Sequence, residues 1–182
     1  MKRFCFMLVA LAIAANSMAG EVYNNAVKVT FLSWVTGSTK ISYERVLPNK
    51  QTAEFCTSLI GAGYDKFQND PLGFTMRYAH KFFVGDNYGG GLTGTYVRPE
   101  VIYSHYNYNA QDVLQMRMQA RMCAVLATAG YQINFNRFLI DAWAGAGYAF
   151  GLPAETGYHH GFALWRSDNV ALSFSIRLGY CF

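Results

Sequence analysis

Four histidines carry the side chains best suited to acid–base or metal chemistry: His80, His105, His159 and His160. A hydrolase needs a nucleophile, a general base and an orienting acid within hydrogen-bond reach. Ser104 and His105 are neighbours in the chain, but adjacent side chains on a strand point to opposite faces. The chain also contains no His-x-Ser sequence. The histidines therefore predict no catalytic residues.

His159 and His160 are also candidate metal ligands, with Asp168 in the same stretch. Two adjacent histidines in a loop are more often simply solvent-exposed, so we expect neither a metal site nor a cofactor. Beyond residue 19 the chain has three cysteines, an odd number whose spacing matches no zinc pattern. We interpret Cys56, Cys123 and Cys181 as small buried residues on the small or polar face of their strands. A single disulfide remains an alternative in an oxidising compartment.

Charged side chains recur at alternate positions among apolar residues, and these are the second set of candidates. On strands, this spacing places the charges on one face. The cations are Lys28, Lys40, Arg77, Lys81, Arg98, Arg117, Arg121 and Arg177, and the acids are Glu44, Glu54, Glu100 and Asp141. Opposite charges buried on one face should pair, because an unpaired buried charge is costly. We expect a structural ion-pair network with an excess of cations that water relieves, rather than a catalytic cluster.

The last strand, residues 170–182, shows the element type that must position these charges. Its even positions are large and apolar, and its odd positions are small or polar, with Arg177 among them. This period of two predicts a strand with two unlike faces, and its length suffices for a membrane-spanning strand of about 9–11 residues. The chain ends on Gly179, Tyr180, Cys181 and Phe182. An aromatic end of this kind resembles the C-terminal assembly signal of bacterial outer-membrane β-barrels.

Seven further stretches alternate in the same way, and no helix, linker or long internal repeat is evident. The eight predicted strands cover residues 26–35, 39–47, 51–64, 72–83, 95–108, 114–135, 138–152 and 170–182. We expect bulges where the alternation slips, after Ile60 and after Ala127, and an irregularity at Pro99, which cannot donate a ladder hydrogen bond. The pattern predicts an all-β fold, an eight-stranded antiparallel up-and-down barrel formed by residues 20–182.

The first 19 residues have the features of a secretory signal peptide: Lys2 and Arg3, an apolar run, and small residues before Gly20.

The low fraction of charged residues also favours a membrane protein. Charged residues make up 14% of the chain, against about 25% in soluble domains. The formal net charge is +4, and Lys2 and Arg3 contribute two of these charges, so no nucleic-acid partner is indicated. If the rest of the chain spans a membrane, it must do so as a closed barrel.

Volume indicates which face points outward. Eight strands enclose a space that side chains just fill, and the Phe, Tyr, Leu and Met of the apolar faces are too bulky for it. We therefore expect the apolar faces to contact lipid, and the short turns at residues 48–50 and 136–137 to face the periplasm with the loop at 85–93. The connections at 36–38, 65–71, 109–113 and 153–169 then face outward.

With this layout the chain resembles the small eight-stranded outer-membrane barrels of the OmpA/OmpX type. The stretch around Ser42-Tyr43-Glu44-Arg45 also resembles small barrel proteins of the Bacteroidota. The resemblance implies an outer-membrane location, with lipid and the barrel-assembly machinery as partners.

The expected role is structural or adhesin-like, through outer-loop contacts with an extracellular protein or glycan. The candidate contact residues are Tyr106, Tyr108, Tyr158, His159, His160 and Trp165. The alternatives are a lipid A-modifying enzyme, a narrow pore and a soluble carrier with its aromatics inside.

Overall fold

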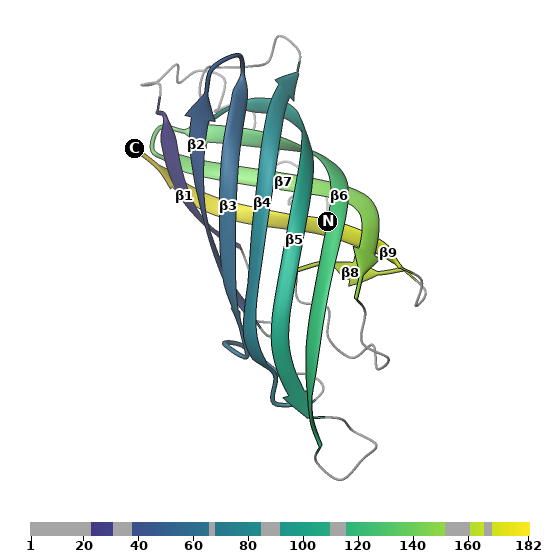
Figure 1. Cartoon of the computed structure of the whole chain (residues 1–182). Coiled ribbons are helices and arrows are strands. Elements are labelled where there is room, and N and C mark those ends of the chain that lie inside the picture. Colours follow the sequence, from purple (N-terminus) through teal and green to yellow (C-terminus); the bar gives the residue numbers. More distant parts are fainter. Residues whose placement is uncertain are drawn as a thin grey trace, which may run out of the picture.

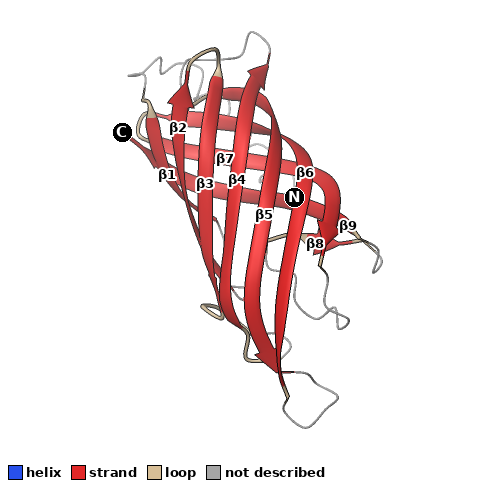
Figure 2. Ribbon diagram, viewed as in Figure 1, coloured by secondary structure: helices blue, strands red, loops and turns tan. Residues whose placement is uncertain are grey.

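The computed structural model describes residues 23–30, 38–65, 68–84, 92–109, 116–151, 161–165 and 169–182. In these ranges the chain forms nine strands and no helix (Figures 1 and 2). The strands are β1 (Asn25–Thr30), β2 (Ser38–Leu47), β3 (Gln51–Ile60), β4 (Leu72–Val84), β5 (Gly94–Asn109), β6 (Arg117–Phe135), β7 (Phe138–Phe150), β8 (Ala163–Leu164) and β9 (Val170–Cys181). A search of the same residues for a helix long and apolar enough to cross a membrane finds none.

Eight of these strands close into an antiparallel barrel within the described part of the chain, as the sequence predicts. Each strand pairs with its neighbour in the order β1 to β7 and then β9, and β9 pairs back onto β1 from Ala26↔Cys181 to Thr30↔Arg177. The strands at the front cross those at the back at a steep angle (Figure 1). The two-residue strand β8 pairs with the start of β9. It adds a pairing that the alternation pattern does not predict.

The two ends of the barrel differ. At one end lie the tight turns after β2 and β6 and the chain terminus, where Asn25 and Phe182 exchange backbone hydrogen bonds of 3.1 and 2.9 Å. We call this the C-terminal end. At the opposite end, which we call the hairpin end, β5 and β6 pair as far as Asn109↔Arg117. Pairing of β6 with β7 reaches only Cys123↔Phe150, so the hairpin extends past β7 (Figure 1).

Pairing between strands fixes which face each residue occupies. Directly opposite residues of an antiparallel pair share a face, and the inward residues Arg98 and Glu100 of β5 lie opposite Thr128 and Leu126 of β6. The even positions of β6 therefore point inward. This register continues without interruption along all of β6, so the predicted slip after Ala127 is absent.

This register corrects the predicted positions of Arg117 and Arg121, which we expected inside the barrel. Both are on the odd face of β6 and are exposed, and Arg121 lies opposite the outward-facing His105. Met122, expected toward lipid, is instead buried at 2% exposure. Cys123 is also on the outward face, opposite Tyr103, and not on the small inward face as predicted. The local alternation was correct, but its assignment to inside and outside was reversed.

Two predicted irregularities have different outcomes. The slip after Ile60 is not a bulge, because β3 ends at Ile60 and Gly61 takes a positive φ of 92°. The irregularity at Pro99 is confirmed in the β4–β5 ladder. The paired residues run to Ala79↔Glu100 and resume at Phe82↔Val97. Pro99 is outward and exposed, and the register is the same on both sides of it.

Candidate functional site

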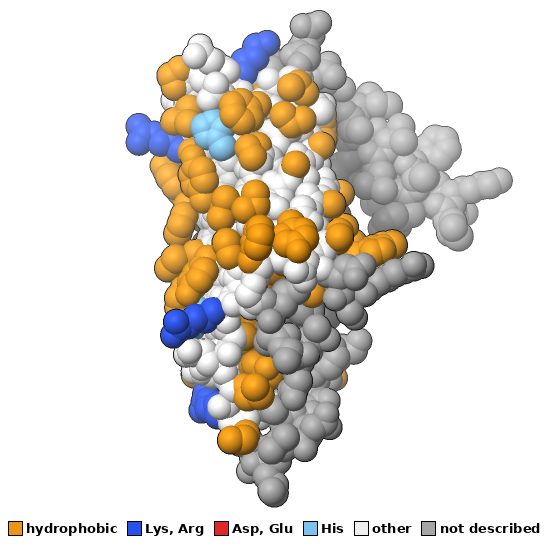
Figure 3. Space-filling model, turned by 45° about the vertical axis from the view of Figure 1, so that its right-hand side comes forward, with side chains coloured by type: hydrophobic (Ala, Val, Ile, Leu, Met, Phe, Trp, Pro, Cys, Tyr) orange, Lys and Arg blue, Asp and Glu red, His pale blue; other side chains and the backbone are white. Residues whose placement is uncertain are grey.

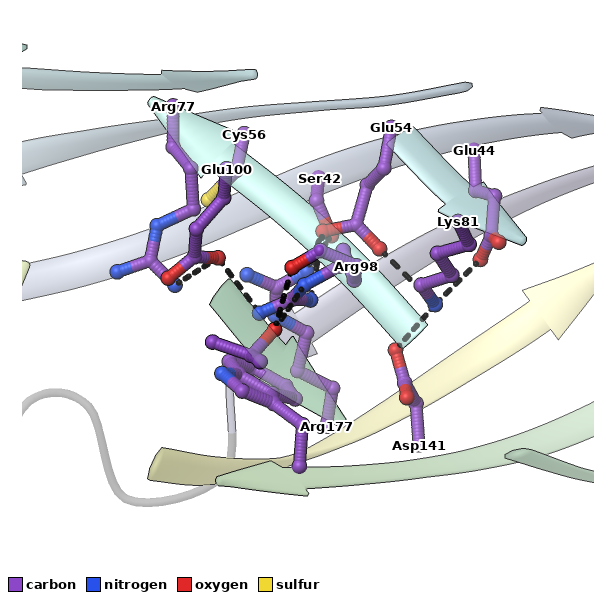
Figure 4. Close-up of polar contacts among 12 residues, drawn as sticks. Ser42, Glu44, Glu54, Cys56, Arg77, Lys81, Arg98, Glu100, Asp141 and Arg177 are labelled. Carbon is purple, nitrogen blue, oxygen red and sulfur yellow. Dashed lines mark hydrogen bonds and ion pairs between the residues drawn. The ribbon is translucent and has the colours of Figure 1, made fainter. Parts of the chain in front are cut away.

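The most concentrated polar chemistry of the described residues lies inside the barrel, toward its C-terminal end. Lys28 of β1 and Lys81 of β4 converge on Asp141 of β7, and each ammonium nitrogen lies 2.8 Å from Asp141 Oδ2. Lys28 also contacts Glu54 at 2.8 Å and pairs with Glu44, and Lys81 lies 3.2 Å from Glu44. Strands from opposite walls thus direct their side chains to one point (Figure 4). All five side chains are fully buried.

Arginines extend this network toward the hairpin end. Arg177 pairs with Glu54, and its Nη1 also donates to Ser42 Oγ at 3.3 Å. Arg98 Nη2 lies 2.6 Å from Glu100 Oε2, and Arg77 Nη1 lies 3.5 Å from the same oxygen. Figure 4 shows Glu100 between these two guanidinium groups. Lys40 is on the same inward face but is only half-buried. The predicted ion-pair network therefore forms, but without Arg117 and Arg121, which face outward, and without Lys40, which makes no ion pair with a described residue.

Neutral side chains complete the network, and the sequence gives them no such role in advance. Tyr96 donates its hydroxyl to Asp141 Oδ1 at 2.5 Å, and Gln132 Oε1 accepts from Lys81 at 2.5 Å. The guanidinium carbons of Arg98 and Arg177 each lie 4.3 Å from the centre of a Trp143 ring. Tyr96 and Trp143 follow the same alternation as Arg98 and Asp141, and this could have identified them. The cations are thus held by aromatic faces as well as by carboxylates.

The buried charges do not balance within the described residues. Five cations are buried, namely Lys28, Arg77, Lys81, Arg98 and Arg177, against four acids, Glu44, Glu54, Glu100 and Asp141. This agrees with the predicted excess of cations. Oxygen atoms of Glu44, Glu54 and Asp141 lie within 4.8 Å of one another, a spacing that could hold a metal ion. In this structure the two lysine ammonium groups bridge these carboxylates.

The described histidines do not combine with a nucleophile. Ser104 is buried and shares a 2.9 Å hydrogen bond with Thr75, whereas His105 is on the outward face and lies 3.2 Å from the Gln119 amide. The prediction that Ser104 and His105 face opposite ways is confirmed. His80, also outward, lies 2.8 Å from Gln51 Oε1. The predicted residues Tyr158, His159 and His160, like Asp168 and the predicted signal peptide, lie outside the described residues.

An apolar cluster occupies much of the interior of the hairpin end. It consists of Ile60, Ile102, Tyr106, Tyr108, Ala120, Met122, Ala124, Leu126, Ala149, Phe162 and Ala171. Tyr106 and Tyr108, predicted as outer-loop contacts, are 1% and 3% exposed. That prediction is corrected, because the even positions of β5 point inward along its whole length. Trp165 is 53% exposed, as an outer contact residue would be.

A segment of the connection between β7 and β9 enters this apolar region. Phe162 is 6% exposed and belongs to the buried cluster. The Gly161 carbonyl accepts a hydrogen bond from Arg77 Nη2. A Cβ at Gly161 would lie 3.2 Å from methyl groups of Ile102 and Thr75, and its φ is +124°. Gly161 and Phe162 are therefore held in the mouth of the barrel by a charged hydrogen bond and an aromatic contact, and the β8–β9 pairing fixes Ala163 and Leu164 beside them.

The barrel is similar to solved structures of small outer-membrane barrels. The N-terminal β-barrel domain of Pseudomonas aeruginosa OprF matches with a TM-score of 0.55 and 10% identity, covering 88% of this chain and 98% of that one. Neisserial surface protein A (NspA) gives 0.43 and 11%, covering 87% and 94%. Ail of Yersinia pestis, solved with the heparin analogue sucrose octasulfate, gives 0.39 and 13%, also covering 87% and 94%. The OprF match supports the fold.

Comparison by sequence gives a family. No curated protein matches the chain significantly. A family profile, described as "Protein of unknown function (DUF3575)", matches residues 4–153, which is most of the chain. The matched region includes β1 to β7 and with them all of the buried acids of the interior network. The closed eight-stranded barrel described above is thus a member of the DUF3575 family.

Proposed function

We propose that the protein is an integral outer-membrane β-barrel with a non-catalytic role, either structural or in surface contacts at its hairpin end. The observation that carries this proposal is the reversal of the usual protein surface. Each barrel strand presents large apolar side chains outward, whereas four of the six described acids are buried inside. Figure 3 shows this hydrophobic belt, with no acidic side chain visible on the described surface in that view. A lipid bilayer is the solvent that suits such a surface.

The closure of the barrel by backbone pairing supports the same proposal. A barrel closed by β1–β9 pairing leaves no open edge, as lipid requires. Along β5, the outward residues from Thr95 to Tyr103 cover about 27 Å of strand, or about 20 Å along the barrel axis for a tilt of about 40°. This is close to the apolar band of about 25 Å in outer-membrane barrels. The C-terminal end, with its short turns, then faces the periplasm, and the hairpin end faces outward.

The membrane proposal is tested by the gel migration of detergent-solubilised membranes from cells that express the whole chain. A folded barrel migrates differently before and after boiling. A protein that is monomeric and soluble without detergent would contradict the proposal.

Deleting Phe182 tests the proposed assembly signal, since the truncated chain should be exported but should fold in the membrane in smaller amounts. Equal folded yields would count against that role.

The filled interior favours a closed barrel over a narrow pore. Phe162 and its apolar neighbours occupy the hairpin end, and the charge network fills the region beneath it. We expect liposomes containing the folded protein to swell no faster in sugar solutions than empty liposomes. Faster swelling that rises with protein content would favour the pore.

Surface contact through the outer connections is the finer part of the proposal. It is supported by the extension of the β5–β6 hairpin past β7 and by the exposed Trp165. The test replaces residues 110–113 with a Gly/Ser turn and introduces Trp165→Ser, and then compares binding of the folded protein to host cells and matrix proteins. The exposed Phe174→Ser variant, on the lipid-facing side, is the control. Unchanged binding in the loop variants would make the role purely structural.

A further inference from the structure

Arg117 and Arg121 are the two strand arginines that the sequence places wrongly, and their actual positions require an explanation. Both are exposed on the outer surface of β6, with Gln119 exposed between them. On β5, their register partners are Asn109 and His105. Nowhere else on the described barrel strands do two arginines share one outward strand face. A strand position facing lipid is a costly place for an arginine, unless it lies at the membrane interface.

The two arginines begin where the apolar belt ends. The outward pair Tyr103↔Cys123 is the last pair of the belt along this hairpin, and the next outward pair is His105↔Arg121. Arg121 is thus about 7 Å of strand beyond the belt. From this pair onward the outward residues of the hairpin are all polar: His105, Asn107, Asn109, Arg117, Gln119 and Arg121. This places the polar face at the depth of lipid headgroups rather than hydrocarbon.

The protein itself supplies no counter-charge to these arginines among the described residues. The ion pairs of this part of the chain involve Lys28, Arg77, Lys81, Arg98 and Arg177 only, and all are inside the barrel. Arg117 and Arg121 are four residues apart on one face, about 13 Å along the strand. The Gln119 amide between them lies 3.2 Å from His105 Nε2, and the His105 ring is stacked on Phe74 at 5.8 Å. The polar face therefore has a guanidinium group on each side of the Gln119–His105 contact.

We propose that the outward face formed by His105, Arg117, Gln119 and Arg121 binds the phosphate groups of an outer-leaflet lipid of the lipid A type. The guanidinium fork matches a phosphate in two parallel hydrogen bonds. The spacing of the two arginines suits a headgroup with two separated phosphates, and the neighbouring belt residues contact its acyl chains. The ligand neutralises the two charges that the described residues leave uncompensated. This inference rests on the proposed outer-membrane location.

The test measures lipid A retained by the folded, full-length mature protein in a neutral detergent. Each arginine lost should weaken retention about fivefold, and the Arg117→Gln/Arg121→Gln double variant should bind about thirtyfold more weakly. The matched control is Arg45→Gln/Arg137→Gln, which removes two exposed arginines near the C-terminal end. It should change retention by less than about twofold. An Arg117→Lys/Arg121→Lys variant should keep part of the binding, because it keeps the charge.

Four results would overturn the inference. One is equal retention by the Arg117→Gln/Arg121→Gln variant and the wild type, with both showing heat-modifiable migration. Another is displacement of lipid A by inorganic phosphate at the same phosphate concentration, which would identify a site for a free ion instead. A wild-type protein that does not show heat-modifiable migration at all would overturn the membrane proposal together with this inference. A folded wild type that retains no lipid A overturns this inference alone.

Discussion

The two halves of the barrel interior are filled by opposite means. The half toward the C-terminal end holds lysines and arginines bridged by four carboxylates, with a small apolar cluster that includes Ala26, Leu139 and Cys181 at the end itself. The half toward the hairpin end holds a larger apolar cluster around Phe162. Charges need partners at defined distances and angles, and a missing partner leaves the other charge exposed to a poor solvent. Apolar groups need only volume and contact. Single substitutions in the first half should therefore lower the free energy of unfolding more than single substitutions in the second half.

Removing one carboxylate from the charged half should have the largest effect. Glu54 pairs with Arg177 and contacts Lys28 at 2.8 Å and Lys81 at 3.4 Å. Glu54→Gln leaves these cations undercompensated, and we expect it to lower the free energy of unfolding by about 3–5 kcal/mol. Urea titration of the refolded protein in lipid vesicles, followed by tryptophan fluorescence, measures the loss.

A second substitution separates charge from packing at Glu54. The Glu54→Gln/Arg177→Met double variant removes one charge of each sign, so it should recover part of the lost stability. A double variant that loses the sum of both single effects would show that charge pairing is not what stabilises this half.

In the apolar half, Phe162→Ala should cost less than the Glu54 change. Removing a buried phenylalanine costs about 3–5 kcal/mol in a rigid core. Here residues 161–165 can detach locally, so we expect about 1–3 kcal/mol in global unfolding, with faster protease cleavage of this segment. Phe174→Ala, at a side chain 70% exposed toward lipid, is the control and should leave cleavage unchanged. Equal protection of residues 161–165 from protease in both variants would mean that Phe162 does not hold this segment in place.

The hydrogen bond between Tyr96 and Asp141 joins the charge network to a tightly packed part of the barrel wall. Tyr96 donates to Asp141, and a Cβ at Gly130 would lie 2.5 Å from the Tyr96 hydroxyl oxygen. Tyr96→Phe removes a donor from a buried carboxylate, so we expect a loss of about 1–3 kcal/mol. Gly130→Ala should cost a similar amount by overpacking. The same Cβ would also lie 2.5 Å from the Ala142 carbonyl oxygen and 2.6 Å from Tyr96 Cζ, and the Tyr96→Phe variant keeps both atoms. The alanine should therefore cost nearly as much in that background, and a large gain there in a double-mutant cycle would contradict this packing.

The smallest effect is expected from a cation outside the barrel. Arg121→Gln removes the same charge as a substitution of a buried arginine would, but at an exposed position. In neutral lipid the free energy of unfolding should change by less than about 0.5 kcal/mol. Arg177→Gln, measured in parallel, should cost several times more, because it leaves Glu54 without its closest guanidinium partner. Similar losses in the two variants would remove the distinction between the charges inside and those outside.

Much of the charged half could be predicted from the sequence. Lys28, Glu44, Glu54, Arg77, Lys81, Arg98, Glu100, Asp141 and Arg177 all lie inside, as their alternation with apolar residues predicts. These residues lie on strands whose apolar face is unambiguous. The residues that were misplaced lie where both faces look alike. At the start of β6, methionines alternate with arginines and glutamine, and long side chains of either kind can face lipid headgroups or a polar interior.

The distances between the charges could not be predicted in the same way. Lys28 and Asp141 are 113 residues apart in sequence, yet their charged atoms lie 2.8 Å from each other. That approach depends on the register of every strand pair between them. Gly179 contributes to it, because a Cβ there would lie 2.9 Å from Lys28 Cγ. The sequence assigns this glycine to an assembly signal, which stays a prediction, and gives no hint that it makes room for a lysine.

The sequence by itself determined the strands and, within each short run of clear alternation, which residues share a face, because alternation is a local property that each strand carries without its neighbours. Only the tertiary structure decided which face of β6 is inside, that Tyr106 and Tyr108 point inward and that Phe162 enters the barrel. These outcomes depend on register and closure. A shift of one residue in pairing exchanges the two faces of a strand, and the volume enclosed by the closed wall selects the side chains that fill it.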